Sequence, residues 1–156
     1  MALDNSRLVN ELGMDDIVSN SRTRATASLP LGVNWIMGSG TPFTSAPAGT
    51  LTLTAANMLT GICTISPSTA NTTTFDTAAN IVAAVNASSA GAVVGDIVDF
   101  LVINGNGTNA ITVAAGTNGT FDTNQANRSI PVNTSKEFLI RLTNVTPGSE
   151  AYVIYF

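Results

Sequence analysis

The residues that could carry out chemistry in this chain are few and lack partners of the right type. Among 156 residues there is no histidine and only one cysteine, Cys63, within the run Gly-Ile-Cys-Thr-Ile. A catalytic thiol needs a neighbouring base, and histidine is the commonest general base and a frequent zinc ligand. Cys63 is therefore interpreted as a small apolar core residue on a strand. An intermolecular disulfide is the alternative.

The carboxylates are not spaced as a catalytic pair. Asp96 and Asp99 are three residues apart, so on a strand they point to opposite faces and share no site without a bulge. Asp99 lies in an apolar run, and we expect either an exposed position or an ion pair with Arg141. Asp122 and Asn124 offer oxygen ligands suited to calcium. Asp-x-Asn is too common a pattern in this Asn-rich chain to predict a calcium site.

Phosphate and nucleic-acid binding are not indicated either. The chain has no G-x-x-x-x-G-K-[ST] motif, and the glycines within residues 102–110 lie between two expected strands rather than before a helix. The net charge is −4, and three of the six basic residues are Arg7, Arg22 and Arg24, near the start. Nucleic-acid binding depends on neutralising phosphates. We therefore predict no enzyme, no cofactor, no metal and no nucleic-acid partner.

The composition favours a protein that is permanently assembled. Charged residues make up 10% of the chain and hydrophobic residues 44%, whereas about 25% charged residues is usual. Such a chain covers its surface with Thr, Asn and Ser, or buries it against other chains. Few charges also mean weak repulsion between molecules.

Short apolar runs separated by Asn, Gly and Thr predict an all-β fold. Expected strands occupy residues 51–54, 62–66, 96–104, 110–115, 119–121, 129–132, 136–145 and 151–156. Asn104-Gly105, Asn106-Gly107 and Asn118-Gly119 have the composition of hairpin turns, and Pro147-Gly148 makes the last turn. About eight strands and one short helix match a single jelly roll or a related two-sheet sandwich.

Two helical segments are expected within this body. Thr54 is placed to cap a single turn over residues 55–59. Residues 75–87 are the best helix candidate, because Ile81, Val82 and Val85 form an apolar stripe. Asp76 or Thr77 is the expected N-cap of this helix.

The chain divides into three parts. Residues 1–28 are predicted to be an extended N-terminal arm anchored by Leu8, Leu12 and Ile17, with a disordered tail as the alternative. Residues 29–49 contain a short strand around Trp35 and a Gly/Pro/Ser/Thr-rich linker, and residues 50–156 form the body. Neither a signal peptide nor a membrane span is expected, so synthesis in a cytosol-like compartment is predicted. The expected core or subunit-interface aromatics are Trp35, Phe138, Tyr152, Tyr155 and Phe156.

The body resembles small jelly-roll proteins of virions from tailed phages and large DNA viruses. The resemblance is carried by Asp-Phe-x-x-x-Asn followed by Thr-Val-Ala-Ala-Gly, and by Arg-Leu-Thr-Asn-Val-Thr-x-Gly-Ser-Glu-Ala with a terminal apolar strand. Members are similar to capsid decoration proteins, head fibres and heads of collagen-like fibres. The absence of a Gly-X-Y tract argues against the collagen-like version.

This resemblance implies a trimeric jelly roll on the capsid surface, with no catalytic residues. The expected function is that of a decoration or cement subunit in the virion, made in the host cytoplasm. It would bind the major capsid protein through its arm and trimer base, and it would bind no membrane. The alternative is a receptor- or glycan-binding head of a fibre or adhesin, with its site in loops such as residues 104–109. A carbohydrate-active sandwich would need two carboxylates facing one cleft.

Overall fold

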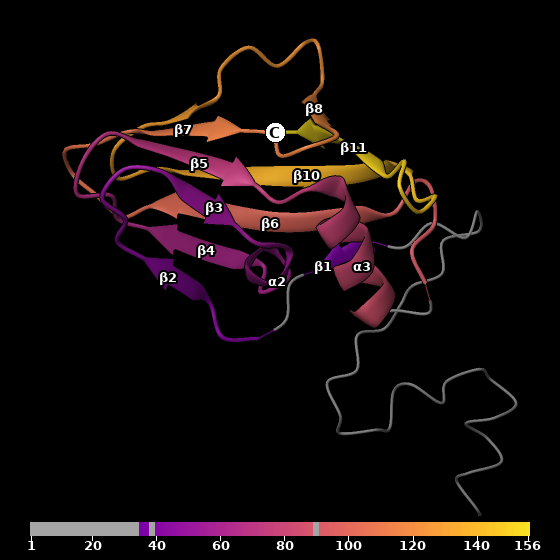
Figure 1. Ribbon diagram of the computed structural model, residues 1–156. Helices are drawn as coiled ribbons and strands as arrows, with labels where there is room; N and C mark the ends of the chain where they lie inside the picture. Colours follow the sequence, from indigo (N-terminus) through magenta and orange to yellow (C-terminus); the bar gives the residue numbers. More distant parts are fainter. Residues whose placement is uncertain (1–34, 38–39, 89–90) are drawn as a thin grey trace, which may run out of the picture.

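The described part of the protein folds as two packed β-sheets with two short helices (Figure 1). The computed structural model describes residues 35–37, 40–88 and 91–156. The expectation of an all-β sandwich is confirmed at the level of two sheets and few helices. The predicted arm, with Leu8, Leu12 and Ile17, lies outside the described residues. No helix within the described ranges is long and apolar enough to cross a membrane.

The larger sheet has seven strands and forms the base of the sandwich. Six of them follow the order β2-β4-β6-β10-β11-β8, and β1 pairs with β6. Because β10 pairs along one side of β6, β1 and β4 follow one another along its other side. The strands are β1 (Trp35–Met37), β2 (Phe43–Ser45), β4 (Ile62–Ile65), β6 (Ile97–Asn104), β8 (Gly119–Phe121), β10 (Ser135–Asn144) and β11 (Ala151–Tyr155).

The smaller sheet has four strands in the order β3-β5-β7-β9. They are β3 (Leu51–Leu53), β5 (Asn71–Phe75), β7 (Ile111–Ala114) and β9 (Ser129–Ile130). From β2 to β7, successive strands alternate between the two sheets. The pairs β2–β4, β4–β6, β3–β5 and β5–β7 are all parallel. This part of the chain is therefore wound like successive turns of a β-helix.

This winding differs from the predicted topology in two respects. A jelly roll is built from Greek keys of antiparallel strands, whereas six of the nine strand pairs here are parallel. The hairpins predicted at residues 104–107 and 118–119 are wrong, because β6 and β8 lie in the larger sheet and β7 lies in the smaller one. The described part of the chain has eleven strands, of which β2 and β5 were not expected, and its two helices fall on the two expected helical segments.

The C-terminal strands form the antiparallel part of the larger sheet. Strand β10 pairs antiparallel with both β6 and β11. The predicted turn at Pro147-Gly148 connects β10 to β11, and Gly148 has a φ of 82° that suits glycine. This hairpin was correctly predicted because its two strands are neighbours in both sequence and sheet.

Both helices are capped by threonine side chains. In α2 (Ala55–Met58), Thr54 Oγ1 accepts a hydrogen bond from Asn57 N at 3.3 Å, as predicted. In α3 (Ala78–Ser88), Thr77 Oγ1 accepts one from Asn80 N at 3.2 Å. Thr77 is therefore the N-cap of α3. The neighbouring Asp76 serves both helices, since its Oδ2 accepts a bond from Ala55 N at 2.9 Å.

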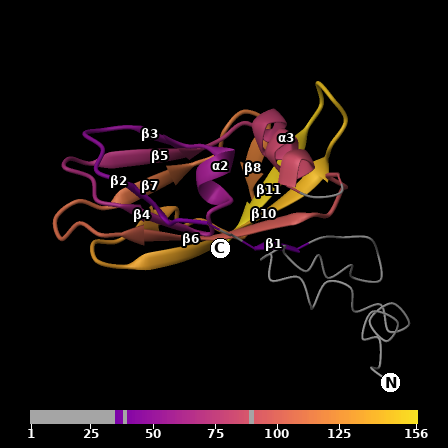
Figure 2. The same cartoon turned by 90° about the horizontal axis from the view of Figure 1, so that it is seen from below.

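The core lies on one face of the larger sheet. Figure 2 shows the smaller sheet, α2 and α3 on the same side of β6 and β10. The rings of Phe75, Phe100 and Phe138 meet there with centroids 5.1–5.8 Å apart. Helix α3 buries Ile81 and Val85. No described element lies on the opposite face of the larger sheet, and that face becomes the candidate site.

Candidate interaction surface

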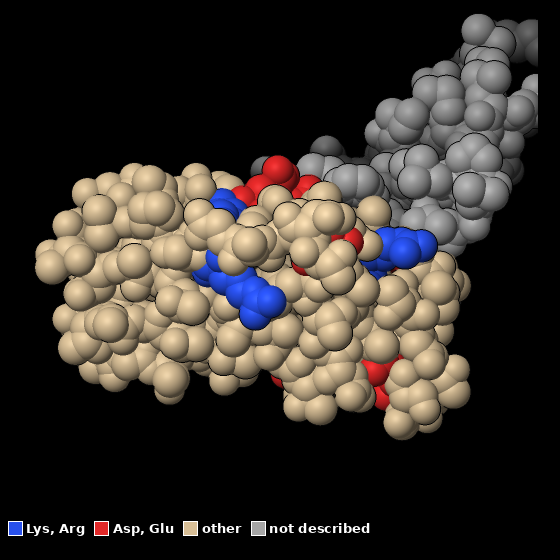
Figure 3. Space-filling model, turned by 90° about the horizontal axis from the view of Figure 1, so that it is seen from above, with Lys and Arg blue, Asp and Glu red and all other residues tan. Residues whose placement is uncertain are grey.

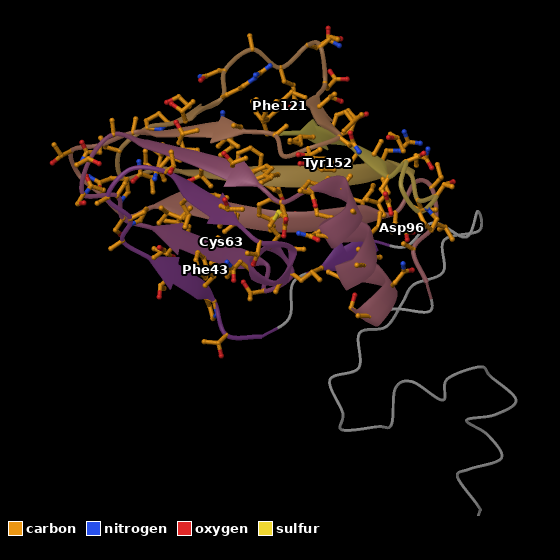
Figure 4. The ribbon with its side chains drawn as sticks, in the orientation of Figure 1. Phe43, Cys63, Asp96, Phe121 and Tyr152 are labelled. Carbon is orange, nitrogen blue, oxygen red and sulfur yellow. The ribbon has the colours of Figure 1, made fainter. Side chains whose placement is uncertain are left out.

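Cys63 is part of the hydrophobic core. Its side chain is fully buried on β4 (Figure 4), and its Sγ donates to Asn57 O at 3.3 Å. Burial raises the pKa of this thiol to about 11, so the reactive thiolate is scarce at neutral pH. The core interpretation is confirmed, and a buried thiol is not positioned for an intermolecular disulfide.

The carboxylates of Asp76, Asp96 and Asp122 accept hydrogen bonds from nearby groups of the chain. Asp96 is fully buried, and its Oδ2 accepts a hydrogen bond from Val93 N at 2.9 Å. Asp76 accepts bonds through Oδ1 from Thr77 N at 2.8 Å and from Asn80 Nδ2 at 2.7 Å. Asp122 Oδ1 accepts from Asn124 N at 3.0 Å, closing a local turn. In the described ranges, no three His, Cys, Asp or Glu side chains gather as a metal site.

The outer face of the larger sheet is apolar. In β6, Val98, Phe100 and Val102 point inward and are buried, while the alternate residues point outward and are only partly covered. The same alternation runs through β4, β10 and β11. We define the apolar face by its large outward side chains: Ile62, Ile97, Leu101, Ile103, Leu139, Val153 and Tyr155. Ile62 is 41% exposed.

The outer face of the smaller sheet has a different composition. Its outward positions, set by the strand register, are Thr52, Thr72, Thr74 and Thr112. Threonine fits a pleated strand and presents a hydroxyl to water. The same chain thus covers one outer sheet face with hydroxyls and the other with aliphatic groups. Such a contrast is typical of one solvated face and one interaction face.

Three charged side chains lie on the apolar face: Asp99, Glu137 and Arg141. The antiparallel register pairs Leu139 with Asp99, Glu137 with Leu101, and Arg141 with Ile97. Asp99 therefore lies diagonally across from both Glu137 and Arg141 on one face. The structure confirms that Asp96 and Asp99 lie on different sides, one buried and one outward.

A hollow of about 360 Å³ opens on the same face, lined by residues of β4, β6 and β10 and by the segment before β2. Ile62 and Leu101 supply its apolar wall, and Asp99 and Glu137 supply two carboxylates. Glu137 is exposed, and its carboxylate forms no hydrogen bond or ion pair within the described part of the chain. Two carboxylates in one hollow are what the carbohydrate-active alternative requires. The hollow also suits an apolar segment that carries positive charge.

The five predicted aromatics are divided between core and surface. Phe138 and Tyr152 are buried within a single chain, so they belong to the core and are not interface residues. Phe156 is partly buried, with its ring 5.6 Å from that of Phe138. Tyr155 lies on the apolar face, opposite Leu139 in the register. For Trp35 the structure gives the backbone position, paired with Ile97 at the start of β6.

The sequence analysis did not single out the aliphatic members of the apolar face. Their signal is present in the runs Ile-Val-Asp-Phe-Leu-Val-Ile-Asn and Glu-Phe-Leu-Ile-Arg-Leu, where apolar residues fall on both strand faces. A strand covered on one face only shows a clean alternation, and a near-continuous run indicates cover on both faces. That run predicts a second covered face.

The asparagine-rich loop 104–109 is held together by its own side chains. Asn104 is fully buried, and its Nδ2 donates to the carbonyl oxygens of Asn109, Ile130 and Pro131 at 2.9–3.2 Å. Asn106 Oδ1 accepts from Thr108 N and Asn109 N. Asn109 Nδ2 donates to Pro67 O at 3.1 Å. The side-chain amides of these three asparagines therefore stabilise the loop through hydrogen bonds to backbone groups.

No protein-family model, curated protein or solved structure matches this chain. The fold and the surface therefore define its class: an all-β sandwich with one hydroxyl face and one apolar face. Figure 3 adds that the visible surface is mostly uncharged, with isolated Lys, Arg, Asp and Glu side chains.

Proposed function

We propose that this protein is a structural subunit of a virion, a homotrimeric capsid decoration or cement protein. The observation that carries the proposal is the apolar face, which no described element covers, in a chain with only 10% charged residues. Exposed apolar patches rimmed by polar groups mark sites of protein association. The partners are further copies of the chain and the major capsid protein, on the outer surface of the capsid.

The resemblance of residues 51–156 to small virion proteins supports the viral part of the proposal. It rests on strand motifs, whereas the Greek-key order of a jelly roll differs from the parallel winding of β2 to β7. The proposal therefore depends on the two-sheet sandwich and its surface. A decoration subunit requires association and no chemistry. The buried Cys63 and the committed carboxylates Asp76 and Asp96 are compatible with such a role.

The alternative, a glycan- or receptor-binding head, has less support. Loops that bind sugars present unoccupied amides and aromatic rings. In loop 104–109, the amides of Asn104, Asn106 and Asn109 already bond to the backbone. A glycan-array signal abolished by substitutions in this loop would favour the alternative.

The first test of the proposal is the native mass of the full chain. We expect a trimer at micromolar concentration, and a chain that stays monomeric there would overturn the proposal. The paired variant Leu101→Thr/Leu139→Thr should shift the mass towards the monomer, because it replaces aliphatic side chains by the hydroxyls found on the opposite sheet. Thr112→Ser on that opposite face is the matched control and should leave the mass unchanged.

The second test is co-sedimentation with virus capsids. The full chain should sediment with the capsids, and the chain lacking residues 1–28 should remain in the supernatant. Unchanged sedimentation of the shortened chain would contradict attachment through the arm. Circular dichroism of each variant shows whether the sandwich is retained.

A further inference from the structure

We infer that the apolar face is the docking site for residues 17–34 of a neighbouring copy of the chain. The inference rests on the self-association in the proposed function and names what covers the face. It requires the segment to be long enough, to start from the right place and to match the face in charge.

The area of the apolar face shows that a second element is needed. The face spans four strands at about 4.8 Å spacing and about seven residues of 3.3 Å each, or roughly 450 Å². A specific interface buries about 800 Å² on each partner. The face thus supplies about half of the area that a stable interface buries on one partner. A segment that extends past the edges of the face would bury further surface on both chains.

The position of β1 indicates where this segment starts. Strand β1 runs parallel to β6, with Trp35 aligned to Ile97 at the first residue of β6. The described chain therefore begins level with the start of β6, at one end of the apolar face. Eighteen extended residues would reach about 60 Å, well beyond a strand of ten residues. That starting point and that reach favour a neighbouring copy over the same chain.

The charges of the two surfaces are complementary. Residues 17–34 contain Arg22 and Arg24 and no acidic residue. The hollow on the apolar face presents the exposed carboxylate of Glu137. An arginine of the segment can therefore pair with Glu137.

The apolar residues of the segment match the rest of the face. Val18, Leu29, Leu31 and Val33 are present among its small polar residues. Ile62 and Leu101 line the hollow beside the carboxylates. Burying aliphatic groups on both sides supplies the stabilisation, and the charge pair with Glu137 sets the register.

Disulfide cross-linking tests this inference on the full chain. The only native cysteine, Cys63, is fully buried, so engineered thiols report without background. Arg24→Cys combined with Glu137→Cys should give covalent oligomers up to the native mass on a non-reducing gel. Arg24→Cys combined with Thr112→Cys, on the opposite sheet, is the matched control and should give none. An internal disulfide within the monomer, or equal cross-linking in both variants, would overturn the inference.

Charge reversal provides an independent measurement. Arg24→Glu should raise the dissociation constant of the oligomer about tenfold, because two like charges then meet at the interface. Adding Glu137→Arg to the same chain should restore the constant, and failure to restore it would count against the pairing. A native oligomer that does not cross-link refutes the docking alone. A native monomer refutes the proposed function.

Discussion

The hydroxyl of Tyr152 connects three parts of the fold and provides the sharpest stability prediction. It donates a hydrogen bond to Asp76 O at 2.9 Å and accepts one from Gly116 N at 2.9 Å. Tyr152 is 1% exposed. Its ring lies between the sheets (Figure 4) and packs closely over Gly119, where an added Cβ would overlap the ring. Tyr152 thus joins β11 to the start of α3 and to the connection between β7 and β8.

Tyr152→Phe removes both bonds and fills the same space. A buried donor or acceptor left without a partner costs about 1–3 kcal/mol. Two groups are affected here, and Gly116 is only partly buried, so we expect a loss of about 2–3 kcal/mol in the free energy of unfolding. For a chain of this length the melting temperature should fall by about 5–10 °C.

The assay is thermal unfolding followed by circular dichroism at a fixed protein concentration, since association changes the apparent stability. Tyr155→Phe is the matched control, because Tyr155 lies on the same strand but points to the outer face. Its loss should stay below about 0.5 kcal/mol. Equal melting shifts for the two variants would refute the bonding role assigned to Tyr152.

Three further predictions concern titration, reactivity and capping. Burial raises the pKa of Tyr152 from 10 to about 12, so between these pH values the tyrosine ionises only in the unfolded chain. The free energy of unfolding should therefore fall from pH 10 to 12, more steeply than in Tyr152→Phe. If the melting temperatures of both proteins fall in parallel over this range, the assigned pKa shift is wrong. Cys63, with its pKa raised to about 11 by burial, should react with a chromogenic disulfide at pH 8 only after denaturation; immediate reaction of the native protein would contradict the burial. Asp76→Asn should lower the free energy of unfolding by about 1–3 kcal/mol, because an amide NH₂ replaces an oxygen that accepts from a backbone or side-chain N–H. Asp122→Asn keeps its single accepting oxygen and should leave the free energy of unfolding almost unchanged. Chemical denaturation of the two variants measures this difference.

The strands and caps were predictable because their signals are local. Apolar runs with flanking turn residues located β4, β6 and β10, and Thr54 was recognised from its position before a helical turn. Two strands were missed. Strand β5 reads Asn-Thr-Thr-Thr-Phe, and its inward Asn71 and Thr73 hydrogen-bond to each other instead of presenting apolar groups.

The topology was not predictable because alternation has the same period in parallel and antiparallel strands. Asn104-Gly105 reads as a hairpin turn, yet Asn104 directs its amide into the sandwich and the chain crosses to the other sheet. The sequence predicted the type of candidate site but not the residues that form it. Low charge predicted an exposed apolar sheet surface, but assigning Leu101 or Leu139 to the outer face requires knowing which face the second sheet covers.

The alternation of strands between sheets has a consequence for the rate of folding. Partners such as β2 and β4, or β5 and β7, lie about twenty to forty residues apart along the chain, so their pairing must close long loops first. Among the described strands, only β10 and β11 pair as consecutive strands of the chain. We therefore expect the β10–β11 hairpin to form early and strands β2 to β7 to pair more slowly. During that delay, newly synthesised chains expose aliphatic strands that can aggregate. We expect chaperones to increase the yield of folded protein.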